Sequence, residues 1–236
     1  MIPTFIINLD RQPERLNSAM LELGGLNLEL SRLSAIDMHT IDPEKGDLVT
    51  LGVKACWQSH LKVFKIMDRD QIPYALIFED DLHVKDLRGI NSILDGLDIS
   101  SWDLIQLGFI TPGIQNKLFR IFKNLETFIF RFIGSICMLY PRENSKTLQR
   151  LRVRLALATP KGFVPDDFLP GTHAYLISNR LARASLILNS PQFLSADDFF
   201  IALSHMRSFK CLRVKRSLFG QKKFPGIGKV RFIHQE

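Results

Sequence analysis

The feature that most constrains this chain is a short apolar run that ends in three consecutive carboxylates. Residues 74–78 read Tyr-Ala-Leu-Ile-Phe, and Glu79, Asp80 and Asp81 follow directly. The run has the length and composition of a core strand and is too short for a typical buried helix. Open α/β sheets bind ligands at the carboxyl ends of their strands, so the three acids are predicted to lie in a ligand crevice.

Three adjacent carboxylates repel one another and are costly to remove from water unless a cation neutralises them. Hard divalent ions such as Mg²⁺ or Mn²⁺ take oxygen ligands of this kind and commonly share them with substrate phosphates. The triplet at 79–81 therefore indicates a metal or nucleotide site, with a solvated turn after the strand as the open alternative.

Composition limits the class of protein and its partners. With 236 residues and 46% hydrophobic content, the chain can bury a full core as one large domain. The net charge of +7 favours anionic partners, namely nucleic acid, nucleotide phosphates or acidic lipids. Neither a signal peptide nor a transmembrane helix is predicted. The odd number of cysteines, with no metal-type spacing, predicts a reducing compartment and three small buried residues: Cys56, Cys137 and Cys211.

The opening of the chain predicts a strand–helix–strand unit. Residues 4–9 read as a buried strand, residues 10–24 as a helix with an apolar face, and residues 28–36 as a second strand. Arg11 and Arg15 fall at the first strand–helix junction, where a helix N-terminus and guanidinium groups can hold phosphate. Ordinary solvated arginines remain the alternative.

Later segments supply further candidate side chains. A helix over 52–70 carries Ser59 and His60, which could reach the crevice, although a packed and hydrogen-bonded histidine is the competing interpretation. Strands are predicted at 101–108 and 171–178, the second followed by a helix capped by Ser178. An acidic pair, Asp197 and Asp198, then precedes an apolar segment and fits either a catalytic base or a helix N-cap pair.

Two segments are unusually basic. Residues 118–133 form a broad apolar, aromatic arc opposite a basic arc when drawn as a helix, which suits a helix in a membrane interface or one that covers the core. They lie within a basic amphipathic insertion predicted at about 112–165. Residues 210–236 are predicted as a basic C-terminal tail, a mobile flap or an electrostatic contact with phosphates or lipid.

The order and spacing of these motifs resemble glycosyltransferase family 25, which includes lipooligosaccharide and collagen galactosyltransferases. The matching segments are Ile7-Asn8-Leu9-Asp10-Arg11 with Arg15, Ala55-Cys56 with Ser59-His60, Ile77-Phe78-Glu79-Asp80-Asp81, Trp102-Asp103 with Gln106-Leu107-Gly108, Gly171-Thr172-His173-Ala174-Tyr175-Leu176-Ile177-Ser178, and Asp197-Asp198. Ser195-Ala196 departs from the family's usual proline–hydrophobic pair, and 112–165 matches no family motif.

The resemblance implies an α/β fold of the GT-A type, with a mostly parallel, Rossmann-like sheet flanked by helices in a single domain over residues 1–236. It also implies a nucleotide-sugar donor, a divalent metal (Mn²⁺ or Mg²⁺), and inversion at the anomeric carbon. The expected donor-binding residues are Asn8, Leu9, Arg11, Arg15, Ser59, His60, Glu79, Asp80, Asp81, Gly171 and Thr172.

Within that set, Glu79 and Asp81 are the expected metal ligands, because alternate side chains on an extended backbone face one side. Asp80 would then turn toward the backbone or a water. An inverting displacement also needs a general base near the acceptor hydroxyl. Asp197 matches the family's aspartate best, and Asp198 is its rival.

The predicted function is transfer of a hexose, most simply galactose, from a UDP-sugar to a saccharide hydroxyl of a lipooligosaccharide or another surface glycan. The expected location is the cytoplasm, peripheral on the inner face of a bacterial membrane, with an anionic membrane surface but no nucleic acid as a partner. Two alternatives stay open: a metal-dependent phosphoryl-transfer or nuclease enzyme, and a non-catalytic sugar-nucleotide-binding module of the same fold.

Overall fold

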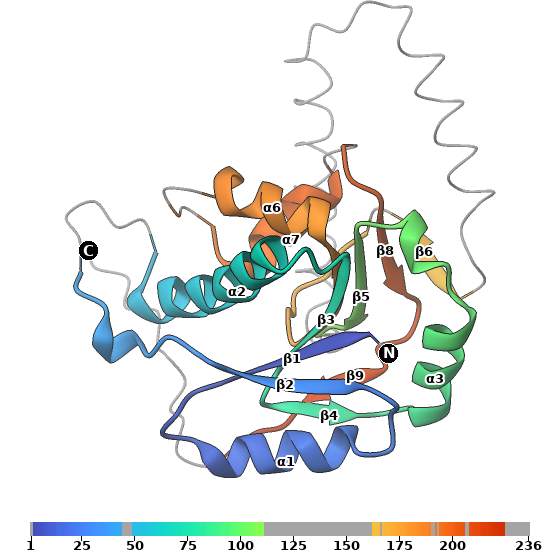
Figure 1. Ribbon diagram of the computed structural model, residues 1–236, viewed down its shortest axis with the longest axis horizontal. Coiled ribbons are helices and arrows are strands. Elements are labelled where there is room, and N and C mark those ends of the chain that lie inside the picture. Colours follow the sequence, from blue (N-terminus) through green and yellow to red (C-terminus); the bar gives the residue numbers. More distant parts are fainter. Residues whose placement is uncertain are drawn as a thin grey trace, which may run out of the picture.

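A mixed β-sheet runs through the centre of the molecule, with helices on both faces (Figure 1). The computed structural model describes residues 2–43, 49–110, 162–165, 167–189, 192, 194–205 and 208–224. Within these residues the main path of the sheet has the order β2-β1-β3-β7-β5-β8-β6. β9 lies off this path and pairs with both β4 and the end of β5.

The strands that form this sheet are short. Their bounds are β1 (Pro3–Asn8), β2 (Glu29–Ser34), β3 (Tyr74–Glu79), β4 (Leu82–Val84), β5 (Leu104–Gly108), β6 (Phe163–Pro165), β7 (Ala174–Ser178), β8 (Cys211–Val214) and β9 (Phe219–Gln221). β1 is parallel to β2 and β3, and β5 is parallel to β8, whereas β7 runs antiparallel between β3 and β5. Because β7 is reversed, its amino end meets the carboxyl ends of β3 and β5.

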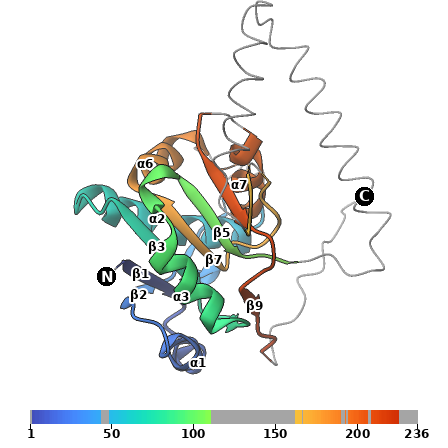
Figure 2. The same cartoon turned by 90° about the vertical axis from the view of Figure 1, so that its right-hand side faces the viewer.

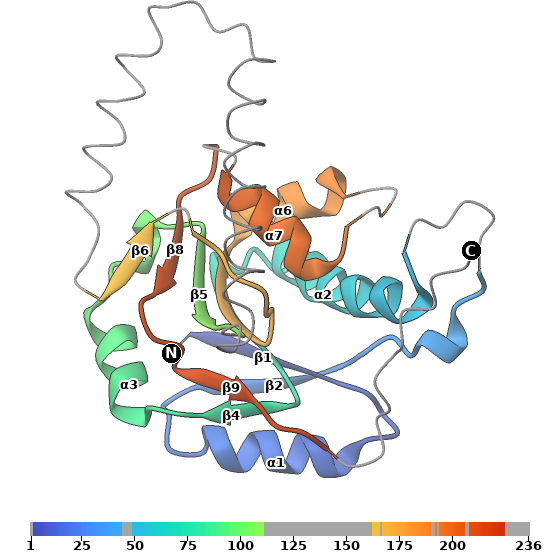
Figure 3. The same cartoon turned by 180° about the vertical axis from the view of Figure 1, so that it is seen from behind.

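Helices cover the two faces of the sheet in two groups, as Figures 2 and 3 show from the side and from behind. One group is α2 (Leu51–Arg69), α6 (Asn179–Leu188) and α7 (Ala196–His205). The other is α1 (Pro13–Leu23) and α3 (Leu87–Gly96). Two single-turn helices, η1 (Met38–Thr40) and η2 (Ile99–Ser101), lie in connections.

Each face of the sheet has its own hydrophobic core. On the α2 face, Trp57 packs against Phe199 with ring centroids 4.7 Å apart. On the α1 face, Leu23 and Ile90 join Leu76 and other residues from the strands. The alternation of side chains along each strand divides the apolar residues between the two cores, which is why β3 is apolar throughout.

The predicted α/β fold, with a sheet flanked by helices, is confirmed. The helix predicted from residue 10 begins at Pro13, because Pro in the first turn needs no amide partner and residues 10–12 form a turn. The helix over 52–70 corresponds to α2, which begins after Thr50, whose side chain accepts a hydrogen bond from the Val53 amide. Ser178 caps α6 as predicted.

The C-terminal basic segment differs from its prediction. Residues expected to begin a surface tail at about 210 instead contribute β8 and β9 to the sheet, and Leu212 and Val214 are buried in it. β8 and β9 were not predicted because they are short and contain or adjoin basic residues, so they show no clear alternating pattern. The amphipathic segment 118–133, and with it most of the insertion predicted at 112–165, lies outside the described residues.

Two other expectations concern membranes and cysteines. Among the residues that the structure describes, no helix has the length and apolar character needed to span a bilayer. Cys211 is buried as predicted, but Cys56 is exposed, and Cys137 lies outside the described ranges.

Candidate functional site

The acidic end of β3 meets the amino end of β7, and this junction forms the centre of the site. The Glu79 amide donates a hydrogen bond to the His173 carbonyl at 3.1 Å. The Thr172 hydroxyl donates to Glu79 Oε1 at 2.9 Å. The antiparallel placement of β7 therefore brings Gly171 and Thr172, predicted as donor-binding residues, next to Glu79 as the motifs suggested.

Helix α2 supplies the next side of the site. His60 is 1% exposed, and its Nδ1 lies 2.7 Å from the hydroxyl of Tyr175. Its Nε2 lies 3.5 Å from Glu79 Oε1 and has no hydrogen-bond partner. Both interpretations of His60 from the sequence are therefore partly met, since the residue is packed and hydrogen-bonded and it also faces the acids.

Helix α7 brings one member of its acidic pair into the same site. The Asp197 carboxylate faces the Gly171 amide and the Thr172 side chain, both of which act to lower its pKa. Burial, followed by the negative charge of Glu79, raises the pKa of Asp197 above its usual range despite these two groups. A carboxylate with a raised pKa beside a crevice is suited to accept a proton.

The other member of the pair is a structural residue. Asp198 is exposed and accepts a hydrogen bond from the Ser195 hydroxyl at 2.7 Å, while the Asp198 amide donates to the same Ser195 oxygen at 3.1 Å. Ser195 thereby caps α7. Of the two candidates for the base, the structure brings only Asp197 to the acidic cluster.

Glu79 and Asp81 have opposite electrostatic environments. Burial, followed by repulsion from Glu79, raises the pKa of Asp81 to about 7. Burial also acts to raise the pKa of Glu79, but its contacts with His60 and Thr172 outweigh this and lower it overall. Glu79 is thus the ionised member of the pair at neutral pH. Among the residues that the structure describes, buried Asp81 Oδ1 has no hydrogen-bond partner, so the pair can accept a cation.

Asp80 has a different environment from the acids on either side of it. The register of β1 with β3 brings Asn8 beside Asp80, and Asn8 Nδ2 donates to Asp80 Oδ2 at 2.8 Å. Arg15 forms an ion pair with Asp80 and lies 3.7 Å from Asp81 Oδ2. Asp80 therefore turns toward Asn8 and Arg15 rather than toward the backbone or a water, and it anchors α1 to the sheet.

The remaining predicted donor-binding residues lie around this centre or beyond it. The Leu9 carbonyl accepts from the Gln12 amide in the turn before α1. Arg11 is 52% exposed and pairs with Asp37. The Ser59 hydroxyl accepts from the Ile36 amide at 2.8 Å and donates to the Ala55 carbonyl, so it fixes the loop after β2 to α2. Neither the Arg11 nor the Ser59 side chain is bonded to the acidic cluster.

Several residues of the site were quoted in motifs but not predicted as site residues. Gln106 is fully buried, and its amide donates to the carbonyls of Leu169 and Gly171 at 2.6 and 2.9 Å. It thereby holds the turn at Gly171, whose φ of +121° favours glycine. A buried glutamine within an otherwise apolar strand was the available signal, because a buried amide requires polar partners. The other missed members are Cys56, His173 and Tyr175.

The thiol of Cys56 faces the same acids. Enclosure by neighbouring groups, followed by the negative charges of Glu79, Asp197 and Asp81, raises the pKa of the thiol well above its usual value. A thiol with so high a pKa is a poor nucleophile at neutral pH, so covalent catalysis by Cys56 is not supported.

A strand-end acid cluster on a mixed sheet, faced by a further acid from a later helix, is the arrangement that the family resemblance led us to expect. Comparison with known proteins agrees: the model of glycosyltransferase family 25 (LPS biosynthesis protein) matches residues 1–201. The chain belongs to glycosyltransferase family 25.

Individual relatives are distant. The inactive glycosyltransferase 25 family member 3 of Mus musculus is 26% identical over 125 residues, which are 44% of this chain and 21% of the mouse protein. A glycosyltransferase involved in the glycosylation of the major capsid of PBCV-1 has a TM-score of 0.40 and 7% identity, covering 80% of this chain and 65% of its own. This chain thus spans only part of the length of each relative.

Proposed function

We propose that this protein is an inverting, metal-dependent hexosyltransferase that moves a sugar, galactose in the first instance, from a UDP-sugar to a saccharide hydroxyl. The main support for the proposal is the presence of two acids side by side at the carboxyl end of β3. Glu79 is ionised, and the buried Oδ1 of Asp81 lacks a hydrogen-bond partner among the described residues. Membership of the family favours glycosyl transfer over the phosphoryl-transfer alternative.

The residues present fit a hard divalent ion. Glu79 and Asp81 supply the oxygen ligands that Mn²⁺ and Mg²⁺ prefer, and a buried carboxylate oxygen without a partner is costly unless a cation or proton satisfies it. When bound, such an ion supplies positive charge that stabilises a nucleoside diphosphate leaving group. The protein's own contribution is to orient the acidic end of β3: the Thr172 hydroxyl holds Glu79, and the Arg15 ion pair holds Asp80 between Glu79 and Asp81.

Asp197 takes the role of general base in this proposal. It lies on the first turn of α7 and close enough to Glu79 for the charge of Glu79 to raise its pKa. Its raised pKa increases its affinity for the proton of an acceptor hydroxyl. The charge of Glu79 is a principal cause of that shift, so neutralising Glu79 would lower the pKa of Asp197 again.

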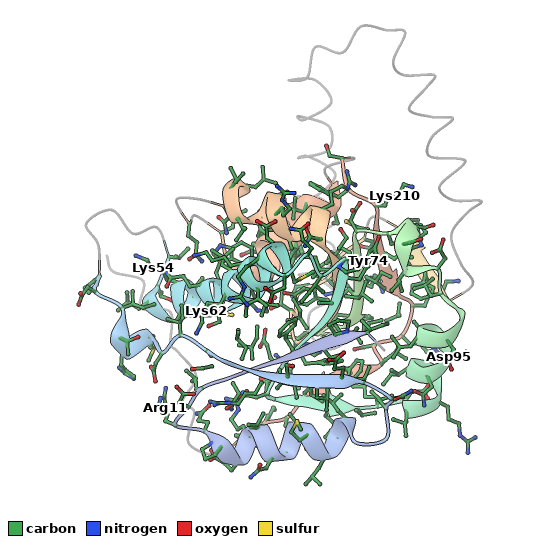
Figure 4. The ribbon with its side chains drawn as sticks, in the orientation of Figure 1. Arg11, Lys54, Lys62, Tyr74, Asp95 and Lys210 are labelled. Atoms are coloured by element: carbon green, nitrogen blue, oxygen red, sulfur yellow. The ribbon has the colours of Figure 1, made fainter. Side chains whose placement is uncertain are left out.

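A panel of nucleotide sugars tests the proposal. The protein is incubated with each donor, with and without Mn²⁺, and release of the nucleoside diphosphate is measured with and without saccharide acceptors. We expect Mn²⁺-dependent turnover of one UDP-hexose, lost in the Glu79→Ala/Asp81→Ala double variant. Asp95→Ala, an exposed residue of α3 on the edge of the molecule in Figure 4, is the matched control that keeps turnover. Turnover unchanged in the double variant would overturn the metal assignment.

A second candidate is a non-catalytic sugar-nucleotide-binding module, because the mouse relative is described as inactive. The two candidates differ in one measurement. Tight binding of UDP with Mn²⁺ by calorimetry, together with no turnover of any donor, would favour the binding module. The presence of Asp197 within the site favours the enzyme.

The proposed location is the cytoplasmic face of a bacterial membrane, where a lipid-linked acceptor would be reached. The net charge of +7 supports attraction to anionic lipid. Flotation with anionic vesicles tests this proposal: the intact protein should float with the vesicles, and deletion of residues 118–133 should abolish flotation. Absence of binding by the intact protein would overturn it.

A further inference from the structure

Helix α2 contributes a thiol and an imidazole to the site, and hard cations such as Mg²⁺ do not prefer either ligand. Cys56 Sγ, a ring nitrogen of His60 and a carboxylate oxygen of Glu79 lie within 4.8 Å of one another. We propose that these three side chains form a binding site for a thiophilic divalent cation of the zinc class. The site is distinct from the Glu79–Asp81 site of the proposed function and shares Glu79 with it.

The strongest support is the unpartnered nitrogen of His60. The ring is 1% exposed, and its Nε2 has no hydrogen-bond partner although it lies 3.5 Å from Glu79 Oε1. That separation is longer than a hydrogen bond. The other nitrogen, Nδ1, lies 2.7 Å from the Tyr175 hydroxyl. With Nδ1–H donated to Tyr175, Nε2 carries a lone pair that faces a carboxylate, and a cation between the two would relieve this repulsion.

The arrangement around His60 is typical of a metal-bound histidine. Such residues usually donate their second ring N–H to an oxygen, which fixes the tautomer and the orientation of the ring. Here the oxygen belongs to Tyr175, which is fully buried and therefore fixed by packing. The partner is in place before any ion binds.

The three ligands come from two rigid elements. Cys56 and His60 are four residues apart on α2 and so lie on one side of the helix, and Glu79 is the last residue of β3. Tetrahedral zinc with metal–ligand distances of roughly 2.0–2.3 Å places its ligand atoms about 3.5 Å apart. The 4.8 Å that bounds the trio exceeds this by only about 1 Å, so binding requires a small closure of the three side chains.

The fourth coordination position can be reached from solvent. Cys56 is exposed and the Glu79 side chain is 24% exposed, so a water or a phosphate oxygen can complete a tetrahedron. A thiolate selects zinc-class ions over Mg²⁺ and Mn²⁺. Binding forms a sulfur–metal bond and releases the thiol proton to solvent, so the affinity rises with pH.

A functional consequence follows if the proposed function holds. Because Glu79 belongs to both sites, a zinc-class ion and the hard ion compete for one carboxylate. Low concentrations of Zn²⁺ would then inhibit a Mn²⁺-dependent transfer reaction, and the inhibition would disappear in Cys56→Ser.

The test uses Co²⁺ as a spectroscopic substitute for zinc on the intact, tag-free, metal-free protein. We expect one equivalent of Co²⁺ to give a sulfur-to-cobalt charge-transfer band and the intense visible bands of tetrahedral cobalt, and Zn²⁺ to remove both. Cys56→Ser should abolish the charge-transfer band, whereas Cys211→Ser should keep it. Tyr175→Phe should weaken Co²⁺ binding by roughly 10- to 100-fold, the usual effect of losing a group that orients a metal ligand.

Two further variants separate this site from the proposed transferase site. Asp81→Asn removes a ligand of the hard-ion site only and should leave the cobalt spectrum unchanged. His60→Gln should lose the tetrahedral bands, and far-UV circular dichroism establishes that each variant is folded. The absence of a charge-transfer band in the wild-type protein, or its persistence in folded Cys56→Ser, would overturn the proposal. Neither outcome depends on transferase activity, which the nucleotide-sugar panel tests separately.

Discussion

Two buried carboxylates, Asp103 and Asp81, lie at opposite ends of the same sheet. The hydrogen-bonding capacity of the first is met by its neighbours, and that of the second is not. Asp103, just before β5, accepts hydrogen bonds from the Ser178 hydroxyl, Arg180 Nε and the Lys210 amide, each at 2.9 Å. Asp81, just after β3, keeps a buried oxygen with no partner. Figure 4 labels Tyr74 and Lys210 near the first end and Arg11 near the other.

The difference shows in the pKa values of the two groups. Burial acts to raise both, but the Arg180 guanidinium and the hydrogen bonds lower the pKa of Asp103 overall. The pKa of Asp81 rises to about 7, because Glu79 adds repulsion to burial. Asp103 therefore stabilises the fold, whereas Asp81 costs folding energy unless a cation or proton is bound. Uncompensated charge, rather than burial alone, distinguishes the candidate site.

The largest expected effect tests the catalytic side of this comparison. Asp197→Asn should lower the rate of transfer by roughly 10²- to 10⁴-fold, the usual contribution of a general base, with little change in the affinity for UDP. Asp198→Asn is the matched control and should retain the rate within a few-fold, because Asp198 only pairs with Ser195. Steady-state kinetics and UDP calorimetry measure both. Equal losses in the two variants would remove Asp197 from its assigned role.

The next largest effect tests the structural side. Asp103→Ala should destabilise the protein by roughly 2–4 kcal/mol, because the Lys210 amide and the Ser178 hydroxyl lose a buried acceptor. Urea unfolding measures the loss. The folded fraction should keep its rate of transfer, and a rate that fell in proportion to the stability would mean that the two ends of the sheet are not independent.

The third prediction concerns pH. Because the folded pKa of Asp81 is raised from 3.8 to about 7, its contribution to stability is complete below about pH 4 and is lost as pH rises through 7. Without metal, Asp81→Asn should therefore be more stable than the wild type at pH 8, by about 4 kcal/mol, and the gain should shrink at pH 5. Thermal unfolding at the two pH values measures this. Mn²⁺ should stabilise the wild type and not the variant, and a gain independent of pH would contradict the prediction.

The smallest expected effects come from removing one hydroxyl group at each end of the sheet, that of Thr172 or that of Ser178. Thr172→Val removes a hydrogen bond of 2.9 Å to Glu79 and should slow transfer by roughly 3- to 10-fold with little loss of stability. Ser178→Ala removes the cap of α6 and should cost about 1 kcal/mol of stability without slowing transfer. Measuring rate and stability in both variants checks whether the two effects separate. A larger loss of rate in Ser178→Ala would reverse the assignment of the two ends.

The sequence predicted the strands and helices that matter most for the site. The apolar run of β3 ending at Glu79, the capped helix after Ser178 and the strand–helix–strand opening are local patterns, and each is confirmed. The strands near the C-terminus were not predicted, because β8 and β9 are short and rich in basic residues. Their stability comes from pairing with β5, β6 and β4, and no local pattern reports such pairing.

Sequence alone determined which residue types would collect at the carboxyl end of β3, since acids that follow a buried strand have only that edge to occupy. Only the tertiary structure decided their separate environments. It turned Asp80 toward Arg15, left Asp81 unpartnered, and brought Asp197 rather than Asp198 to the site. The physical reason is that charge compensation depends on neighbours distant in the sequence, which the antiparallel β7 and the packing of α2 and α7 bring together.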